Sequence, residues 1–483
     1  MTDEQETLLK EPVFRYFHEI CQVPRPSMRE GQISDYLLRW ALDRGLEAQK
    51  DGAKNVLIHK PAAPGYENAP CVMLQAHMDM VCEKAPGVEH DFDRDPIVWQ
   101  IDGDRISTGG RTTLGADDGI GVAFALAVLA DKELPHPELE VLFTTAEEED
   151  FSGAANFDTG KMRADRIINL DHACDREILC GSCGGMAVEL NVPVASGPVP
   201  AGWEARRLTV SGLQGGHSGE DIHRGHGNAS TLLVRVLLAF EEAGLSYRLG
   251  PVVGGSFRLA IPRDAYGVVC FPGEQAETME RIVEEQKKIM KGELSVTGAN
   301  LDLRFESAPV PAWCAEGGSL VTAAILVPDG IYQMNETLVG LVDTSDNVGE
   351  LYLEENQLRM VAEIRSARPS LGNYLFQRMC RVAKLLGGTC ESSKAYPSWE
   401  FHPRSQFREI AGQAYRELFG SDPTYLTVHA GLEVGFLSEK KSRLDAIAIG
   451  PDCWNFHSPT EQLSISSARK VYQFLCQILK QCR

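Results

Sequence analysis

The hydrophobic pattern of the first third of the chain predicts strands that alternate with helices. Two amphipathic helices are expected within residues 11–49, separated by the proline-containing stretch CQVPRPS. An Asp-, Gly- and Pro-rich loop covers residues 86–112, and the apolar segment 119–129 predicts a buried helix. Buried strands are expected at NVLIHKP, PCVMLQAHMDM, ELEVLFTTAEEE and ADRIINLD. This alternation predicts an α/β sheet, in which ligands bind at the carboxyl ends of the strands.

The pattern changes near residue 187. Helices are expected near residues 227–243, 277–293 and 371–387, between short strands at RRLTVSGL, SYRLGPVVGG, FRLAIP and YGVVCFP. After Gly388 the first pattern returns, with a helix at 405–419, the strand DAIAIGP and a helix at 464–481. The sequence therefore predicts a discontinuous α/β domain, residues 1–186 and 389–483, and an inserted α+β domain with antiparallel strands, residues 187–388.

Composition narrows the classes of function. The formal net charge of −21 argues against nucleic acid and anionic membranes as partners. No run of 18 apolar residues predicts a membrane helix, and the acidic N-terminus lacks the apolar core of a secretory signal. The 13 scattered cysteines indicate free thiols in a reducing cytoplasm. Cys180 and Cys183 have the spacing of a redox pair or a zinc knuckle. Because no second cysteine pair stands at ligand spacing, the favoured interpretation is that they pack beside a glycine turn.

Candidate metal ligands recur where predicted strands end. His77 and Asp79 are two residues apart at the end of VMLQA, so they share one face of that strand. Other acids and a histidine follow further segments: Asp117 in LGADDGIG, Glu147 and Glu148 in TAEEED, Asp171 after RIINL, and His457 in FHSPTE. Each alone is explained by a helix cap, a turn or a solvated loop. Together on one rim, the carboxylates would repel one another without cations. Mixed imidazole and carboxylate ligands suit zinc, with manganese or cobalt as alternatives.

The order of these motifs resembles that of a known superfamily. QAHMDMV, LGADDGIG, TTAEEEDFSGA, INLD, GGHSG and FHSP are similar to motifs of the dinuclear zinc aminopeptidase, carboxypeptidase and dipeptidase superfamily of the aminoacylase type. CQVPRPSMREGQISDYL, GGHSGEDIHRGHGNA and HAGLEVG resemble its aminoacyl-histidine (Xaa-His) dipeptidase branch, the bacterial carnosinases. The resemblance covers essentially the whole chain. It implies a mixed sheet flanked by helices, and an inserted lid that forms a homodimer.

The resemblance also implies a role for each motif residue. Five ligands would hold two metal ions: His77 and Asp171 for one, Glu148 and His457 for the other, and Asp117 as the bridge. Glu147 would be the general base, and Asp79 would orient the imidazole of His77. The family commonly has small residues at positions 149 and 150, where this chain has Glu149 and Asp150. The downstream SGA sets the register that makes Glu147 the base and Glu148 the ligand.

Three residues of the insertion are candidates for contact with substrate. The resemblance places His217, between pairs of small residues in GGHSG, on the lid, where it would donate to the tetrahedral oxyanion, often in the partner subunit. Arg365 in AEIRSARPS is the candidate for binding the substrate's terminal carboxylate, with Arg368 as the alternative. Asn347 is a further candidate. The nearby histidines, which are interpreted as loop residues, are His223 and His226.

These expectations favour a cytosolic metallodipeptidase. Its substrates would be Xaa-His dipeptides such as carnosine, or dipeptides of broad range, hydrolysed by a metal-activated water. An N-acyl-amino-acid deacylase of the same superfamily is the alternative, disfavoured by the long insertion and the branch motifs. A non-catalytic binding protein on this fold is expected to lack a ligand or the base, and every such position is chemically competent here. No GxxxxGK[ST] motif supports phosphate binding.

Overall fold

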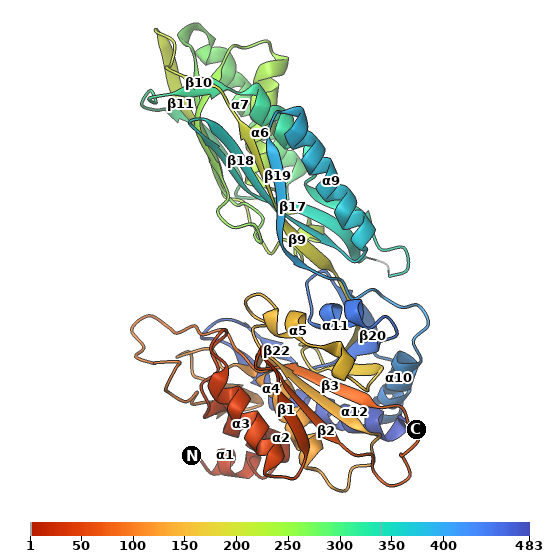
Figure 1. The fold of residues 1–483 in the computed structure, drawn as a ribbon. Coiled ribbons are helices and arrows are strands. Elements are labelled where there is room, and N and C mark those ends of the chain that lie inside the picture. Colours follow the sequence, from red (N-terminus) through yellow and green to blue (C-terminus); the bar gives the residue numbers. More distant parts are fainter. Residues whose placement is uncertain (1, 339) are drawn as a thin grey trace. The chain divides into compact units, whose positions relative to one another are not determined.

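The computed structural model describes residues 2–338 and 340–483, and the chain packs as two compact units (Figure 1). Unit 1 comprises Met1–Ser182, Trp399–Thr427 and Leu432–Arg483, and unit 2 comprises Cys183–Ser398 and Val428–Gly431. Unit 2 takes in more of the chain than the predicted insertion 187–388, because the strands β9 (Gly184–Pro193) and β19 (Thr389–Tyr396) belong to its sheet. Within the described residues no helix is long and apolar enough to cross a membrane.

Unit 1 is built on a mixed sheet flanked by helices, which confirms the predicted α/β class. The sheet has the strand order β1 (Glu47–Lys50), β2 (Val56–Lys60), β6 (Leu139–Thr144), β3 (Val72–His77), β7 (Arg166–Asn169), β21 (Asp445–Ala448), β8 (Glu177–Ser182), β20 (Thr424–Val428). The four central strands β6, β3, β7 and β21 run parallel. Their carboxyl ends therefore lie at one edge of the sheet. Each residue of β3 and of β6 is buried, as expected for strands covered on both faces.

The helices of unit 1 bury apolar faces against this sheet. The helices are α1 (Asp3–Leu8), α2 (Pro12–Cys21), α3 (Gly31–Leu42), α4 (Ala116–Ala130), α5 (Ser152–Asn156), α10 (Gln406–Phe419), α11 (Val434–Lys440) and α12 (Ile465–Gln481). Six of them, α1, α2, α3, α4, α10 and α12, share one apolar core with the strands. Helix α4 is made almost wholly of small and apolar residues and is buried nearly throughout, so it needs no polar face. A small antiparallel sheet completes the unit: β4 (Gln100–Asp102), β5 (Arg105–Ser107), β22 (Cys453–Trp454) and β23 (Gln462–Ser464).

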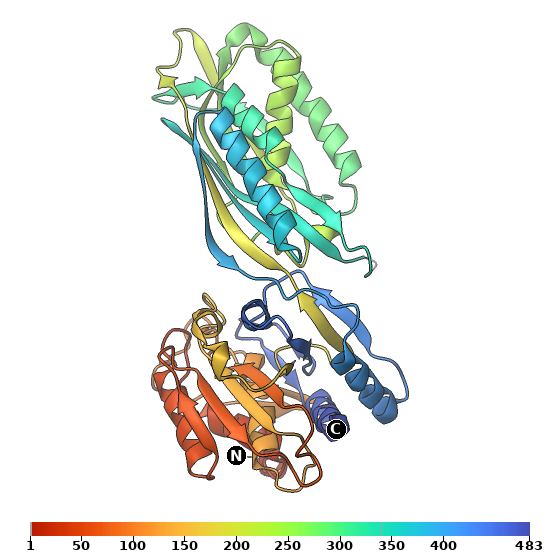
Figure 2. The same ribbon diagram turned by 45° about the vertical axis from the view of Figure 1, so that its right-hand side comes forward.

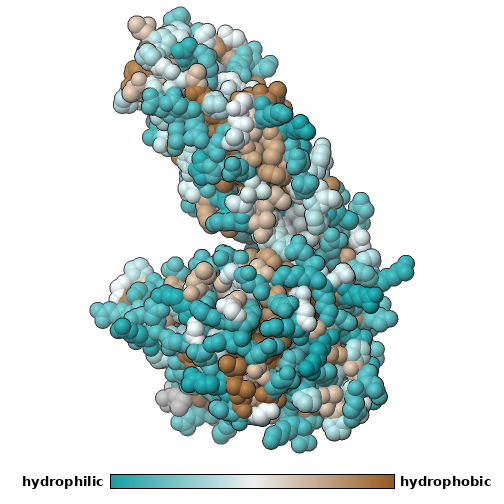
Figure 3. Space-filling model, in the orientation of Figure 1, coloured by the Kyte–Doolittle hydropathy of each residue, from teal (hydrophilic) through white to brown (hydrophobic). Residues whose placement is uncertain are grey.

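Unit 2 is a largely antiparallel sheet with helices on one face (Figure 2). The strand order is β14 (Asp302–Ser307), β11 (Trp203–Ser211), β13 (Ala265–Pro272), β12 (Arg248–Gly254), β17 (Val342–Glu354), β18 (Gln357–Ser366), β9, β19, with β10 (Ser196–Gly197), β15 (Cys314–Glu316) and β16 (Gly330–Met334) paired beside it. The helices are α6 (Ala229–Glu242), α7 (Ala276–Glu293), α8 (Gly318–Leu326) and α9 (Pro369–Leu385). They form one apolar core with the sheet. The surfaces of both units are largely hydrophilic in Figure 3, in keeping with the high charge of the chain.

One predicted strand is wrong. The segment FRLAIP has the alternation of a strand, but residues 257–262 form an irregular loop. The side chain of Asn347 on β17 holds this loop, because its amide nitrogen donates to the carbonyl oxygens of Arg258 (2.9 Å) and Ala260 (3.0 Å). These two carbonyl groups are thus bonded to a side chain, and the pairing of the segment with backbone is limited to an isolated bridge between Ala260 and His217.

Candidate metal centre and active site

His77 is the last residue of β3 and its imidazole lies between two carboxylates. The Nε2 atom is 3.0 Å from Oδ1 of Asp117, and Nδ1 is 3.4 Å from Oδ1 of Asp79. The imidazole is buried, as is Asp79. One ring nitrogen thus faces Asp117 and the other faces Asp79, the arrangement that proteins use to orient a metal-binding histidine.

Asp117 stands at the centre of the cluster. Its Oδ1 faces His77, and its Oδ2 lies 3.4 Å from Nε2 of His457. His457 in turn lies 3.0 Å from Oε2 of Glu148. A carboxylate whose two oxygens face two different imidazoles has the geometry that a bridge between two ions requires.

The candidate ligands divide into two groups that share Asp117. One group is His77, Asp117 and Asp171, and the other is Asp117, Glu148 and His457; in each, the ligand atoms lie within 4.8 Å of one another. A third overlapping group joins Glu147 to His77 and Glu148. Four of these side chains lie at or just after the carboxyl ends of β3, β6 and β7, and the other two come from the start of α4 and the loop between β22 and β23. The five predicted ligands and the predicted base are therefore brought together at one edge of the sheet.

The electrostatics of the cluster fit bound cations. Burial raises the pKa of Asp171 well above its usual range, and the neighbouring Asp117 raises it further. Burial likewise raises the pKa of Glu147 and of Glu148, with repulsion from nearby carboxylates adding to both. Within the described part of the chain, Oε1 of Glu148 is buried without a hydrogen-bond partner. Two divalent cations would bind these oxygens and remove the repulsion. Imidazole nitrogen with carboxylate oxygen is a donor set that suits zinc and similar ions.

Besides lying next to His77, Asp79 accepts hydrogen bonds from the backbone of the next strand end, which the sequence did not predict. Its Oδ1 accepts a hydrogen bond from the backbone N–H of Glu147 (3.2 Å), and its Oδ2 accepts from the N–H of Glu148 (3.3 Å). The hydroxyl of Ser27 donates to Oδ2 at 2.7 Å. Burial would raise the pKa of Asp79, but the neighbouring His77 and these donors hold it below its usual value. The same anion therefore orients His77 and fixes the turn that carries Glu147 and Glu148.

Two buried glutamates that the sequence analysis missed support the site. Glu461 accepts hydrogen bonds from the backbone N–H groups of Leu114 (2.7 Å), Gly115 (2.9 Å) and Ala116 (2.8 Å), and so holds the loop that leads to Asp117. Glu433 accepts from the amide of Gln75 on β3 and the hydroxyl of Thr144 on β6, both at 2.6 Å. Burial raises the pKa of Glu433 to about 7. Glu433 lies in the motif HAGLEVG and Glu461 in FHSPTE, and these motifs are the sequence signal that could have identified the two residues.

In unit 2, His217 and Arg365 lie side by side. Nη2 of Arg365 is 3.4 Å from Nε2 of His217. The Nδ1 atom of His217 accepts hydrogen bonds from the backbone N–H groups of Gly219 (3.3 Å) and Glu220 (3.1 Å), which assigns the ring proton to Nε2. Burial lowers the pKa of His217, and the guanidinium of Arg365 lowers it further. Two donors thus lie side by side, which is an arrangement suited to an anionic oxygen.

The other candidates of unit 2 are engaged elsewhere. The guanidinium of Arg368 donates to the buried carboxylate of Asp343 at 2.8 Å, whereas Arg365 is almost fully buried beside His217. Asn347 holds the loop 257–262 as described above, and its contact with substrate stays a prediction. His223 lies in a short 3₁₀ helix, Ile222–Arg224, and His226 in the loop after it, and neither joins a candidate metal group among the described residues.

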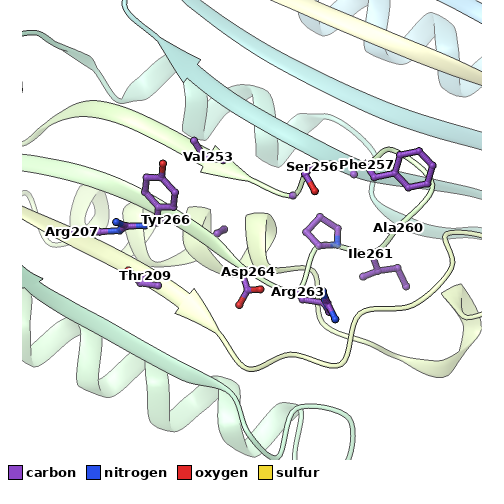
Figure 4. A pocket seen from close by; sticks show the side chains of 14 residues that line it. Arg207, Thr209, Val253, Ser256, Phe257, Ala260, Ile261, Arg263, Asp264 and Tyr266 are labelled. Carbon is purple, nitrogen blue, oxygen red and sulfur yellow. The ribbon is translucent and has the colours of Figure 1, made fainter. Parts of the chain in front are cut away.

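A pocket of about 350 Å³ on unit 2 contains none of the predicted site residues (Figure 4). Arg207, Tyr266 and Arg263 are among the side chains that line it, and the guanidinium of Arg207 stacks on the ring of Tyr266 at 3.7 Å. The catalytic assignment therefore rests on the carboxylate and imidazole cluster of unit 1 and not on this concave surface.

The cysteines form no disulfide, and the spacing of Cys180 and Cys183 reflects packing. Both thiols are buried, and burial raises their pKa to about 12 and about 11. Thiols held protonated in this way are poor nucleophiles and poor metal ligands. The interpretation of the pair as packing beside a glycine turn is thus supported.

Comparison with known proteins identifies the family. Residues 73–481 match the model of Peptidase family M20/M25/M40. The chain belongs to this family. It is 37% identical over 481 residues to the cytosol non-specific dipeptidase of Escherichia coli, covering 99% of each chain. The solved aminoacylhistidine dipeptidase of Vibrio alginolyticus matches with a TM-score of 0.92 and 36% identity over 99% of this chain and 98% of that one. The fold is shared by the aminopeptidase PepT of Bacillus cereus. That structure is 17% identical and matches with a TM-score of 0.56 over 99% of this chain and 98% of that one.

The double role of Asp79 in this M20 peptidase can be tested by Asp79→Ala. Loss of the anion releases the imidazole of His77 and the backbone of Glu147 and Glu148, while every predicted ligand side chain remains. We expect kcat to fall by about 10–100-fold, with metal content close to that of the wild type. Ser27→Ala, which removes a single hydrogen bond to Asp79, is the matched control and should retain most activity. Full activity of Asp79→Ala would remove Asp79 from the mechanism.

The role of Glu461 can be tested by Glu461→Gln. The substitution places an amide against backbone N–H groups and loses charge-assisted hydrogen bonds, so we expect the free energy of unfolding to fall by about 1.5–3 kcal/mol. Metal affinity should fall as well, because the loop before Asp117 loosens. Thermal unfolding and metal titration measure the two effects. The exposed Glu133 provides the control Glu133→Gln, and equal stability of the two variants would contradict this role.

Proposed function

We propose that the protein is a metal-dependent dipeptidase that hydrolyses Xaa-His dipeptides such as carnosine, or dipeptides of broad range. The observation that carries the proposal is the pair of ligand groups that share Asp117, with Glu147 beside them. A binding protein has no need of a bridged pair of ion sites with an additional carboxylate at its edge. Peptide hydrolysis uses all three parts.

The ligand set would hold two divalent ions, which supply Lewis acidity at the scissile carbonyl and an acidified water when bound. Zinc is the first candidate, and manganese or cobalt are alternatives. Glu147 belongs to neither of the two ligand groups that share Asp117. Its carboxylate is therefore available to accept the proton of the attacking water and to pass it to the leaving amine. Asp79 keeps the turn of Glu147 fixed while this proton moves.

Unit 2 supplies groups for the rest of the substrate. The guanidinium of Arg365 is suited to the carboxylate that every dipeptide carries at its C-terminus. The Nε2–H of His217 is suited to the oxyanion of the tetrahedral intermediate, since its neutral tautomer is set by the backbone donors at Nδ1. A homodimer through unit 2, in which His217 acts on the partner's site, stays a prediction.

The relatives support two versions of the specificity. The Escherichia coli protein is named a cytosol non-specific dipeptidase and the Vibrio alginolyticus protein an aminoacylhistidine dipeptidase, and the chain is about equally similar to both. We propose a cytosolic location on the same grounds. The N-acyl-amino-acid deacylase remains the alternative activity for the same ligand set.

The proposal is tested by hydrolysis of a substrate panel after chelation and after adding back zinc, manganese or cobalt. The panel contains L-carnosine, other Xaa-His dipeptides, dipeptides without histidine, and N-acyl amino acids. Release of amino acids from dipeptides, lost on chelation and restored by metal, is the expected result. Cleavage of N-acyl amino acids alone would replace the dipeptidase by the deacylase, and no cleavage with any metal would contradict both.

The role of Glu147 is tested by Glu147→Gln. The amide keeps the shape of the side chain but cannot accept the proton, so kcat should fall by about 10²–10⁴-fold. Because Glu147 is outside the five ligands, two ions should still bind. The exposed neighbour Glu149 gives the matched control Glu149→Gln, which should keep wild-type kcat. Loss of an ion from Glu147→Gln would show that the assignments of Glu147 and Glu148 are exchanged.

A further inference from the structure

Three residues on neighbouring strands of unit 2 lie in a row across the sheet, and the middle residue is a glycine. Arg365 on β18 pairs with Gly185 on β9, and Gly185 pairs with Tyr396 on β19. Directly paired residues of antiparallel strands project to the same face. Because Gly185 has no side chain, the phenol of Tyr396 crosses β9 and its Oη accepts a hydrogen bond from Nη1 of Arg365 at 2.8 Å. A Cβ atom at Gly185 would lie 2.3 Å from that oxygen.

A β-bulge brings Tyr396 into this row. Ser393 pairs with Ala187, but Tyr396 pairs with Gly185, so β19 contains one residue more than β9 over this stretch. Lys394, inside the bulge, has a φ of 49°. In a regular ladder Ala395 would lie opposite Gly185 and no phenol would reach Arg365.

The hydrogen bonds of the phenol have a fixed direction. Tyr396 donates its proton to Oε1 of Glu363 at 3.3 Å, which leaves its oxygen as the acceptor for Arg365. Oε2 of Glu363 lies 3.0 Å from Nε of Arg258. Glu363 is two residues before Arg365 on β18 and opposite Ala187, so it projects to the same face. Burial raises the pKa of Tyr396 well above its usual value, which keeps the phenol protonated.

The remaining donors of Arg365 point toward His217. Nε and Nη2 lie 3.4 and 3.3 Å from Oγ of Ser218, and Nη2 lies 3.4 Å from the imidazole of His217. The phenol therefore holds one arm of the guanidinium, while the other arm lies beside Ser218 and His217. A bidentate contact with a carboxylate depends on the orientation of this planar fork.

We propose that Tyr396 is a positioning residue that orients Arg365 for the substrate's terminal carboxylate, and that Gly185 is required to let it do so. This rests on the proposed role of Arg365 in binding that carboxylate. It also gives a function to the CGSCGG motif: the second cysteine packs beside Arg365, and the last glycine leaves the gap that the phenol crosses. Positioning acts on binding of the carboxylate and not on the metal centre.

The first test is Tyr396→Phe, which keeps the ring and removes only the oxygen. We expect KM for a dipeptide to rise about tenfold while kcat changes less than about threefold, because a hydrogen bond to a charged group is lost and Ser218 still holds the arginine. The preference for a dipeptide over its C-terminal amide, as a ratio of kcat/KM, should fall by the same factor. Tyr247→Phe is the matched control, since Tyr247 is a buried tyrosine of unit 2 whose phenol donates to Glu241. It should leave both constants unchanged.

The second test is a double-mutant cycle between Gly185 and Tyr396. Gly185→Ala should raise KM in the wild type by displacing the phenol, but should change KM less than about twofold in a Tyr396→Ala background, where the methyl group has room. Thermal unfolding of each variant confirms that it is folded at the assay temperature. Additive effects of the two substitutions would overturn the proposal.

The variant Arg365→Gln distinguishes a failure of the role proposed for Arg365 from a failure of the role proposed for Tyr396. If it leaves KM unchanged, Arg365 does not bind the carboxylate, and the positioning proposal falls with that role. If Arg365→Gln raises KM strongly and Tyr396→Phe does not, Arg365 keeps its role and Tyr396 loses its own. A fall in kcat at constant KM for Tyr396→Phe would also overturn positioning, because it would indicate an effect on the chemical step.

Discussion

Repulsion among buried carboxylates is the constraint on which the rest of this structure depends. Asp117, Glu147, Glu148 and Asp171 are gathered with two imidazoles at the carboxyl ends of parallel strands. Burial and mutual repulsion raise the pKa of three of these acids, and hydrogen bonds with Asp117 and Glu148 raise the pKa of His457 to about 10. Hydrogen bonds with His457 and His77 lower the pKa of Asp117 despite its burial, and bound cations would favour the ionised form of the other acids. In this M20 fold, the negative charge of the clustered carboxylates thus favours the binding of cations at the site.

Hydrogen bonds from outside the ligand set hold these acids in place. Glu461 fixes the backbone up to Asp117 through four N–H groups, and Asp79 fixes the turn of Glu147 and Glu148 through two. Arg25 adds a further connection, because its Nη1 donates to the carbonyl oxygen of Asp79 at 3.0 Å and its other arm donates to Gly115. These hydrogen bonds fix the backbone that carries the ligands, which is a condition for precise electrostatic catalysis.

The sequence predicted the parts of the site that are local. The spacing of His77 and Asp79 on one strand, and the acids that follow apolar runs, could be recognised because strand periodicity and strand ends are visible in a single segment. Glu461, Glu433 and the bulge at Lys394 could not, because each acts through backbone groups or strands distant in the chain. The alternation of FRLAIP was misleading for a related reason: a distant side chain, Asn347, binds the carbonyl groups of Arg258 and Ala260, and only an isolated bridge to His217 forms. The order of the strands likewise follows from long-range pairing, which periodicity does not contain.

The central claim is that two ions share Asp117, and metal stoichiometry tests it most directly. Purified protein would be stripped with chelator, titrated with zinc by calorimetry, and its metal content measured by mass spectrometry. The account predicts two equivalents per chain for the wild type, weaker binding of both in Asp117→Asn, and loss of one equivalent in Asp171→Asn, which belongs to a single group. A wild type that binds one ion, or an Asp117→Asn variant that keeps one ion at wild-type affinity, would contradict the bridged pair.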